Sequence, residues 1–242
     1  MKVVGIIPAR YNSSRFPGKP LVDLKGKTMI QRVYEGVSKS CILSEVIVAT
    51  DDQRVFEEVK RFGGKVQFTS ADHTTGTDRC GEVAQTIDAD VIINIQGDEP
   101  LVDFRQIDQL AKVFIDSSVH IASLGIKTND ADDLVNPNRI KIVLDGNQNA
   151  MYFSRSPIPN TNNASKSAAA NVNYIRHIGV YAYRKSTLQQ LVQLKPTVLE
   201  QLESLEQLRW MYHGYSVRIV ETDIETPNID VPGDLEKVLA HL

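Results

Sequence analysis

Short runs rich in valine and isoleucine alternate with amphipathic helical patterns along the first hundred residues. The runs lie at 3–7, 46–49, 66–69 and 91–95. Continuous apolar runs of this length are typical of parallel strands covered on both faces. Apolar residues at helical spacing within 29–37, 55–62 and 80–87 predict helices between them, and the second ends at Gly63 and Gly64. This alternation predicts an α/β fold with a mainly parallel sheet flanked by helices.

The pattern changes at about residue 118. Runs at 140–144, 151–153 and 178–183 indicate strands with no long helix between them. We therefore expect residues 118–184 to form a smaller antiparallel extension within one domain spanning residues 1–242. Residues 160–173 are mostly asparagine, alanine and serine, which predicts a mobile loop.

Two more helices are expected near the end of the chain. Leucines recur every three residues between Leu199 and Leu208, so residues 198–213 are predicted to form one helix with a buried leucine stripe. Most of the polar residues between the leucines are expected to be solvated. Residues 235–242 are predicted to form a short helix that begins near Pro232, with Asp234 in its first turn.

Charge and cysteine content exclude several classes of protein. The chain has 242 residues, with 27 Lys and Arg against 30 Asp and Glu, a net charge of −3. This balance argues against nucleic acid or a membrane surface as the partner and favours a small molecule. No apolar stretch approaches the roughly 20 residues that span a bilayer. The two cysteines, Cys41 and Cys80, cannot form a disulfide framework, so we expect a reducing, cytoplasmic setting, with Cys80 in the core.

A basic loop follows the first apolar run directly. Within residues 8–20 it contains Arg10, Arg15 and Lys19 together with small polar residues, glycine and proline. Because ligands of α/β sheets bind beyond the carboxyl ends of the strands, such a loop predicts an anion site. The alternative is a solvated basic loop. Gly26-Lys27-Thr28 lacks the earlier glycine of a P-loop, and no GxGxxG follows a strand, so neither common phosphate motif is present.

Acidic residues follow two other apolar runs. Asp98 lies three residues after the run 91–95, and Asp230 lies in Asn228-Ile229-Asp230. Carboxylate oxygens at the ligand edge of a sheet suit Mg²⁺, which keeps several positions for water and substrate phosphate. An acidic β-turn is the competing interpretation for Asp98. Two aspartates at strand ends are able to share one cation.

The segment 73–79 is a third loop, placed at the start of a helix. Its threonines, Gly76 and Arg79 offer hydrogen bonds to a base or ribose. The competing interpretation is a helix cap, with Thr77 beginning the helix. His73 and His177 do not have the spacing of metal ligands and are expected to be structural.

Several segments in order carry a family resemblance. They include Phe16-Pro17-Gly18-Lys19-Pro20 and residues 7–11, 49–51, 76–79, 94–100, 136–138, 152–159, 176–181 and 205–209. Together they resemble the CMP-Kdo synthetases, the 3-deoxy-manno-octulosonate cytidylyltransferases, over nearly the whole chain. The opening segment is shared more widely with other CMP-sugar synthetases, whereas the later ones are specific to the Kdo type.

The resemblance implies a Rossmann-like nucleotidyltransferase fold, a homodimer and transfer of CMP from CTP to an eight-carbon ulosonic acid for lipopolysaccharide assembly. It implies catalytic roles for Arg10, Arg15, Lys19 and Asp98, and Mg²⁺ bound by Asp98 and Asp230. The implied nucleotide-binding residues are Pro8, Ala9, Arg10, Ser14, Lys19, Thr75, Gly76, Thr77, Arg79 and Gln96. The implied sugar-binding residues are Arg155, His177, Tyr181, Glu206 and Gln207.

The chain departs from the family after residue 159. Family members often continue with an aromatic residue and an arginine, where this chain has Asn160, Thr161, Asn162 and Asn163. The loss of a cation leaves the 8-amino analogue of Kdo open as the acceptor. A non-catalytic nucleotide-binding protein is a second alternative, although Lys19, Asp98 and Asp230 are all retained. A sugar-1-phosphate nucleotidyltransferase is a third, for which a first loop richer in glycine is expected.

Overall fold

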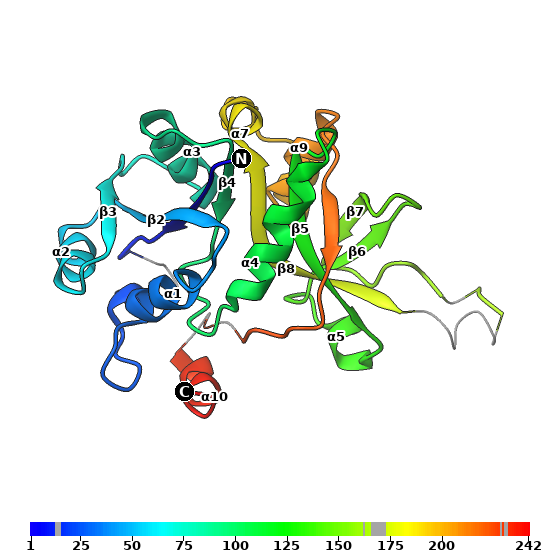
Figure 1. Cartoon of the computed structure of the whole chain (residues 1–242). Helices are drawn as coiled ribbons and strands as arrows, with labels where there is room; N and C mark the ends of the chain where they lie inside the picture. The colour runs from blue at the N-terminus through cyan, green and yellow to red at the C-terminus, as the bar shows by residue number, and fades with distance from the viewer. Residues whose placement is uncertain (13–15, 162, 166–172, 228, 230–231) are drawn as a thin grey trace.

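A computed structural model describes residues 1–12, 16–161, 163–165, 173–227, 229 and 232–242. These residues form a nine-stranded sheet with helices on both faces (Figure 1). The strands of the first half are β1 (Val3–Pro8), β2 (Leu43–Thr50), β3 (Lys65–Phe68) and β4 (Val91–Asn94). They pair in parallel in the order β3-β2-β1-β4, which confirms the predicted parallel sheet.

One of these strands is not buried on both faces as predicted. β3 lies at the edge of the sheet, and Lys65 and Phe68 at its two ends are exposed. An edge strand pairs on one side only and is covered less well than its neighbours. The exposed Phe68 ring stacks on Phe56, with 4.3 Å between the ring centroids.

The second half of the sheet is largely antiparallel, as expected. Its strands are β5 (Ile121–Thr128), β6 (Lys141–Leu144), β7 (Ala150–Ser154), β8 (Tyr174–Arg184) and β9 (Arg218–Glu221). β8 runs antiparallel to β4, β5 and β6 and joins the two halves. β5 and β9 were not predicted from the sequence. Residues 160–173, which were predicted to form a mobile loop, lie mostly outside the described residues.

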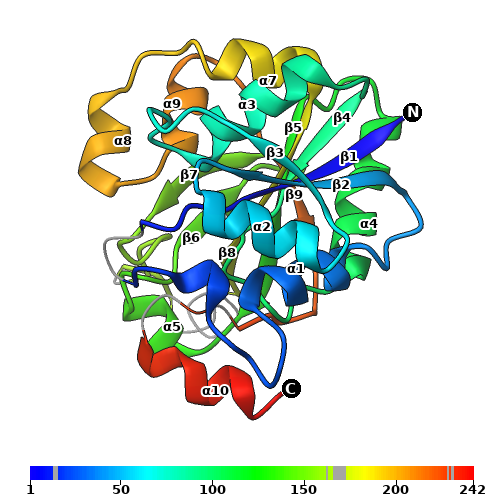
Figure 2. The ribbon, with the colours of Figure 1, turned by 90° about the vertical axis from the view of Figure 1, so that its left-hand side faces the viewer.

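Helices cover both faces of the sheet (Figure 2). One face carries α1 (Met29–Val37), α2 (Gln53–Arg61) and α4 (Phe104–Lys112), followed by a 3₁₀ turn at Val113–Ile115. The other carries α3 (Gly76–Thr86), α7 (Lys185–Leu191) and α9 (Gln207–Tyr212). The short helices are α5 (Ala131–Val135), α8 (Val198–Glu203) and α10 (Leu235–Leu239), with further 3₁₀ turns at Lys19–Leu21 and Pro232–Asp234.

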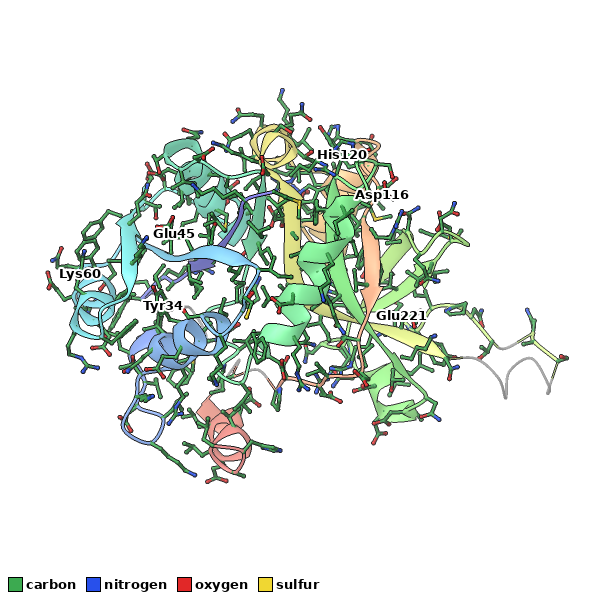
Figure 3. The ribbon with its side chains drawn as sticks, in the orientation of Figure 1. Tyr34, Glu45, Lys60, Asp116, His120 and Glu221 are labelled. Atoms are coloured by element: carbon green, nitrogen blue, oxygen red, sulfur yellow. The ribbon has the colours of Figure 1, made fainter. Side chains whose placement is uncertain are left out.

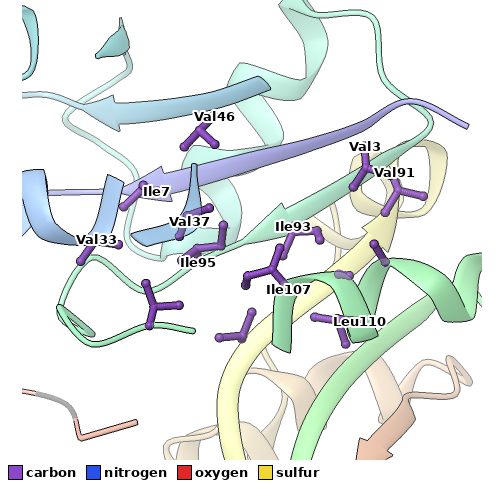
Figure 4. Close-up of a cluster of buried hydrophobic side chains, with 14 of the residues drawn as sticks. Val3, Ile7, Val33, Val37, Val46, Val91, Ile93, Ile95, Ile107 and Leu110 are labelled. Carbon is purple, nitrogen blue, oxygen red and sulfur yellow. The ribbon is translucent and has the colours of Figure 1, made fainter. Parts of the chain in front are cut away.

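The two faces have separate apolar cores. Figure 4 shows the first, where Val33 and Val37 of α1 and Ile107 of α4 lie against strand residues such as Ile93 and Val3. The second lies under α3, α7 and α9 and includes Cys80, whose thiol pKa is raised well above its usual value by burial. Cys80 is therefore a core residue, as predicted. In the described part of the chain, no helix is long and apolar enough to cross a membrane.

The helix predicted over residues 198–213 is wrong. The chain forms two short helices, and Ser204 between them has the left-handed backbone φ of 52°. As a result the leucine stripe divides: Leu205 and Leu208 are buried, whereas Leu199 and Leu202 are exposed. The leucines keep the same spacing on both sides of Ser204, so the apolar pattern does not predict that the helix ends there.

Ser204→Gly should stabilise the protein. A left-handed conformation strains any residue with a Cβ, and glycine removes that strain at an entropic cost, which leaves a gain of roughly 0.5–1 kcal/mol. Chemical denaturation of both proteins measures the difference. Ser38→Gly is the matched control, because Ser38 ends α1 with a right-handed φ of −66° and should lose stability. Equal losses in both variants would contradict the assigned strain.

Candidate active site

A cavity of about 370 Å³ lies at the carboxyl ends of β1 and β4, beside the beginning of α3. Its wall combines the loop after β1, the loop before α3 and the loop after β4. The lining residues are Pro8, Ala9, Arg10, Lys19, Pro20, His73, Thr74, Thr75, Gly76, Arg79, Gln96, Gly97 and Asp98. Three segments that are far apart in sequence therefore meet at the predicted edge of the sheet.

Close backbone contact brings these loops together. A Cβ at Gly97 would lie 2.9 Å from the carbonyl oxygen of Pro8, so only glycine fits there without a shift of the backbone. A Cβ at Gly76 would lie 3.1 Å from the Pro8 ring. Both glycines thus allow the loop after β4 and the start of α3 to approach the end of β1.

Lys19 and Asp98 form an ion pair inside the cavity. Lys19 Nζ donates to Oδ2 of Asp98 over 2.7 Å, and the two side chains are only 11% and 28% exposed. Gly18, with a φ of 75°, begins the 3₁₀ turn that carries Lys19, and its N–H donates to the carbonyl of Tyr11. The turn thus holds a cation within contact of the loop after β4.

Arg79 forms part of the wall in a fixed orientation. Its guanidinium is almost fully buried, donates to Asp51 over 3.1 Å and also donates to Thr69. Asp51 follows β2 directly and Thr69 follows β3. Bonds to the ends of two neighbouring strands hold the cation in place before any ligand binds.

Thr75 caps α3 and also contacts a distant carboxyl group. It forms a capping box with Asp78, so α3 begins at Gly76, immediately after Thr75, and not at Thr77 as the competing interpretation supposed. The hydroxyls of Thr75 and Thr77 both donate to the carboxylate of Glu206, over 3.2 and 2.8 Å. Burial raises the pKa of Glu206 to about 7. Glu206 thus connects α9 with the loop that lines the cavity.

A second group of polar side chains lies on the face covered by α3 and α9. His177 Nε2 is 2.9 Å from the Ser123 hydroxyl, and its ring packs against Phe153 and Tyr181. Burial lowers the pKa of His177 to about 3, so the ring is neutral at physiological pH. Tyr181 in turn packs edge-on against Trp210 of α9.

Several buried polar atoms of this group have no hydrogen-bond partner among the described residues. They are Oδ1 of Asn94, the Tyr181 hydroxyl, Nε2 of Gln207 and Nε1 of Trp210. Asn94 and Tyr181 are paired across β4 and β8, so their side chains share one face of the sheet. Buried polar atoms are nearly always satisfied. The group is therefore suited to a polar ligand or to ordered water.

Arg155 does not line the cavity. Its guanidinium donates to the backbone carbonyls of Glu203, Ser204 and Pro137, which ties the end of β7 to the end of α8. The buried ammonium of Lys141 donates to the carbonyl of Arg155, and burial lowers the pKa of Lys141. Arg155 thus fixes the backbone at the end of α8, directly before the segment that carries Glu206.

The predicted nucleotide residues largely come together. All of the described ones line the cavity except Thr77, whose side chain is buried and bonds to Glu206. Ser14, Arg15 and Asp230 lie outside the described residues. Of the predicted sugar residues, His177, Tyr181, Glu206 and Gln207 belong to the second group and its border. Gln96 links the two regions, because it lines the cavity and donates to the Gly179 carbonyl of β8 over 3.0 Å.

His73 lines the cavity although it was expected to be structural. Its position two residues before the capping residue of α3 was the available signal. Thr74, one of the threonines expected to offer hydrogen bonds, also lines the cavity, although the resemblance did not imply it as a binding residue. Pro20 and Gly97 were missed as well, although both adjoin predicted site residues.

The fit of the site to Mg²⁺ depends on Asp98. Its carboxylate lines the cavity and supplies the oxygen ligands that Mg²⁺ prefers. Within the described ranges, no three His, Cys, Asp or Glu side chains gather as a cation site. The N–H of Ile229 donates to the Asp98 carbonyl over 3.0 Å, so the segment that precedes Asp230 reaches the loop after β4. One protein carboxylate with substrate phosphate is compatible with Mg²⁺.

Another hollow, of about 280 Å³, lies at the opposite edge of the sheet. It is lined by His120, Asn149, Arg218 and neighbouring residues. His120, labelled in Figure 3, precedes the first residue of β5, whereas the cavity described above lies at the carboxyl ends of the strands. The chemistry-bearing residues predicted from the sequence are not part of this hollow.

Comparison with known proteins extends these observations. Residues 4–223 match the cytidylyltransferase family. The chain belongs to this family. It is 48% identical to the 3-deoxy-manno-octulosonate cytidylyltransferase of Geotalea uraniireducens (strain Rf4), covering 100% of this chain and 99% of that protein. The enzyme of the same name from Parabacteroides distasonis is 50% identical, with 100% and 98% covered.

Solved structures agree with these relatives. A CMP:2-keto-3-deoxy-manno-octonic acid synthetase complexed with CTP has a TM-score of 0.94 and 45% identity, covering 100% of this chain and 98% of that one. The 4-diphosphocytidyl-2C-methyl-D-erythritol synthase of Anaerococcus prevotii is 13% identical with a TM-score of 0.64, covering 99% of this chain and 98% of that one. The second likeness shows the nucleotidyltransferase fold alone.

Replacing Glu206 with Gln should change how stability depends on pH. The pKa of Glu206 is about 7 in the folded protein against 4.5 in the unfolded chain. Between these values the folded state binds a proton that the unfolded state lacks, so stability falls as pH rises from about 4.5 to 7. In Glu206→Gln this loss should disappear. Between pH 5 and pH 8 the unfolding free energy of wild type should therefore fall by on the order of 2 kcal/mol more than that of the variant.

Denaturant unfolding at pH 5 and pH 8 measures this difference. Glu57→Gln is the matched control, because Glu57 is exposed on α2 and its replacement should leave the pH dependence unchanged. Parallel pH profiles for Glu206→Gln and wild type would show that the burial of Glu206 does not affect stability.

Proposed function

We propose that this chain is a 3-deoxy-manno-octulosonate cytidylyltransferase, which transfers CMP from CTP to the anomeric hydroxyl of Kdo and releases pyrophosphate. The observation that carries the proposal is the full-length similarity to enzymes of that name, together with the TM-score of 0.94 to a synthetase complexed with CTP. The cavity offers the matching chemistry, since the cations Arg10, Lys19 and Arg79 line a space suited to a triphosphate.

The triphosphate side of the reaction is assigned to the basic residues of the cavity. Lys19 and Arg10, together with Arg15 by the resemblance, compensate the charge of CTP and the charge that grows on the leaving pyrophosphate. The oxygen of the acceptor hydroxyl bonds to the α-phosphorus as the bond to the pyrophosphate oxygen breaks. The ion pair with Asp98 already holds the Lys19 ammonium in the cavity, so the side chain needs little reorganisation when the triphosphate binds.

Mg²⁺ is proposed as the cofactor, with Asp98 and, by the resemblance, Asp230 as the residues that hold it. When bound, the ion supplies charge compensation and lowers the pKa of the acceptor hydroxyl. The support for this assignment is the half-buried carboxylate of Asp98 in the cavity. The chain itself positions Asp98 through Lys19 and through the backbone bond from Ile229.

The acceptor is assigned to the second polar group, beside Glu206. The unsatisfied atoms of Tyr181 and Gln207 are suited to the hydroxyls of a sugar acid, and the neutral ring of His177 lies next to them. Arg155 remains the proposed partner for the sugar carboxylate. To reach it, the guanidinium would have to exchange at least one of its three backbone carbonyls for the carboxylate.

The alternatives are weaker on the same observations. The relatives are named for Kdo itself, which favours Kdo over its 8-amino analogue. A non-catalytic nucleotide-binding protein would not need the Lys19–Asp98 pair in its cavity. A sugar-1-phosphate nucleotidyltransferase is disfavoured because relatives that are 48% and 50% identical over the whole chain are named for cytidylyl transfer to 3-deoxy-manno-octulosonate.

We also propose a homodimer that forms through residues 118–184 and a cytoplasmic location. Met151 on β7 and Val135 on α5 are large apolar side chains that are 60% and 66% exposed in this segment, which supports a partner surface. Cys41 and Cys80 are both free thiols, which fits a reducing compartment. Light scattering tests the dimer, because a monomeric mass would contradict it.

Asp98→Asn should lower turnover by roughly a hundredfold or more while the fold survives. The substitution removes a charge from the cavity and nothing from the apolar cores. Pyrophosphate release in the presence of Mg²⁺ measures the loss, and circular dichroism checks the fold. Asp88→Asn is the matched control, since Asp88 is 93% exposed and pairs with Lys2 at the surface. Unchanged Mg²⁺-dependent turnover in folded Asp98→Asn would remove the metal role.

Pyrophosphate release with CTP, ATP, GTP and UTP in turn tests the whole proposal. Each triphosphate is offered with Mg²⁺ and either Kdo or its 8-amino analogue, and a chelator is added as the control. We expect release with CTP and Kdo that the chelator abolishes. Bound CTP without release for either sugar would favour the non-catalytic alternative, and release with the 8-amino analogue alone would change the acceptor.

A further inference from the structure

His73 lies in the wall of the cavity and has been given no role so far. Its side chain is 23% exposed and belongs to the loop between β3 and α3, two residues before the capping residue Thr75. The same imidazole borders a shallow groove on the other side, next to Glu82 and Gln85 of α3. It therefore separates the cavity from the outer surface of α3.

Glu82 determines which nitrogen of the neutral imidazole carries hydrogen. Nε2 of His73 and the N–H of Ser70 both meet Oε2 of Glu82. The Ser70 and His73 bonds lower the pKa of Glu82, so its carboxylate is ionised and accepts hydrogen bonds only. Nε2 of His73 must then carry hydrogen, and in the neutral ring Nδ1 is an acceptor.

Nδ1 of His73 has no partner among the residues that the structure describes. Glu82 borders the outer groove and does not line the cavity, whereas His73 borders both. With Nε2 occupied by Glu82, the lone pair on Nδ1 is the polar function that the ring can offer to a molecule in the cavity. A hydrogen-bond donor on that molecule would satisfy it.

We propose that His73 recognises the base of the nucleotide by accepting a hydrogen bond from the 4-amino group of cytosine through Nδ1. Glu82 acts as the positioning residue that keeps Nδ1 free of hydrogen. The inference deepens the proposed function, on which it rests. Cytosine and uracil differ at this atom, because cytosine has an amino donor where uracil has a carbonyl acceptor. A lone pair in the wall therefore favours cytosine and opposes uracil.

The test compares three triphosphates with wild type, His73→Phe and Glu82→Gln. CTP carries the amino donor, UTP carries a carbonyl, and pyrimidin-2-one riboside triphosphate carries only hydrogen at that position. For His73→Phe, kcat/KM for CTP should fall roughly tenfold, the value of one hydrogen bond, while the value for the pyrimidin-2-one nucleotide changes little and that for UTP rises. Glu82→Gln should lower the preference for CTP in the same direction, because a glutamine can donate to Nε2 and move the hydrogen to Nδ1.

His213→Phe is the matched control, since His213 is exposed at the end of α9 and should not alter any of the three values. Wild type that uses the pyrimidin-2-one nucleotide as well as CTP would overturn the proposal. Equal losses of kcat/KM for all three triphosphates in His73→Phe would also overturn it. The His73–Glu82 bond would then only stabilise the loop. Failure of the proposed function is distinct, because wild type would then release no pyrophosphate from CTP.

Discussion

The approach of three backbone segments at the carboxyl end of β1 is the constraint on which the site depends. β1 pairs in parallel with both β2 and β4, so the loops after these strands leave the sheet on the same edge. Gly97 and Gly76 then allow the loop after β4 and the start of α3 to reach Pro8. A side chain at Gly97 would meet the Pro8 carbonyl and force a shift of the backbone directly before Asp98, the partner of Lys19.

Glu206 joins the two regions of the site into one. Its carboxylate accepts hydrogen bonds from two threonines at the beginning of α3. Gln207 and Trp210, which follow it in α9, contribute two of the buried polar atoms that have no partner among the described residues. The break at Ser204 makes this position possible, because a continuous helix would carry residue 206 along a different path. Arg155 and Lys141 hold that break from the side of β7 and β6.

The parallel half of the fold and most of the cavity could be predicted, because both leave local signals. Buried strands give apolar runs, and the ligand edge of the sheet follows from strand order. The break in residues 198–213 could not be predicted from periodicity, since Leu205 and Leu208 keep the spacing set by the exposed Leu199 and Leu202. The role proposed for His73 could not be predicted, because it depends on Glu82, nine residues away, and on a cavity that only the fold assembles.

The Lys19–Asp98 pair has a consequence for competition among anions. An ammonium that already has a carboxylate at 2.7 Å offers little to a simple anion, which must compete with that carboxylate for the same charge. Inorganic phosphate brings no cation to compensate Asp98, so it gains less from Lys19 than from an unpaired ammonium. A ligand that carries both negative and positive charge can engage the ammonium and the carboxylate together, so the pair favours such a ligand over a simple anion.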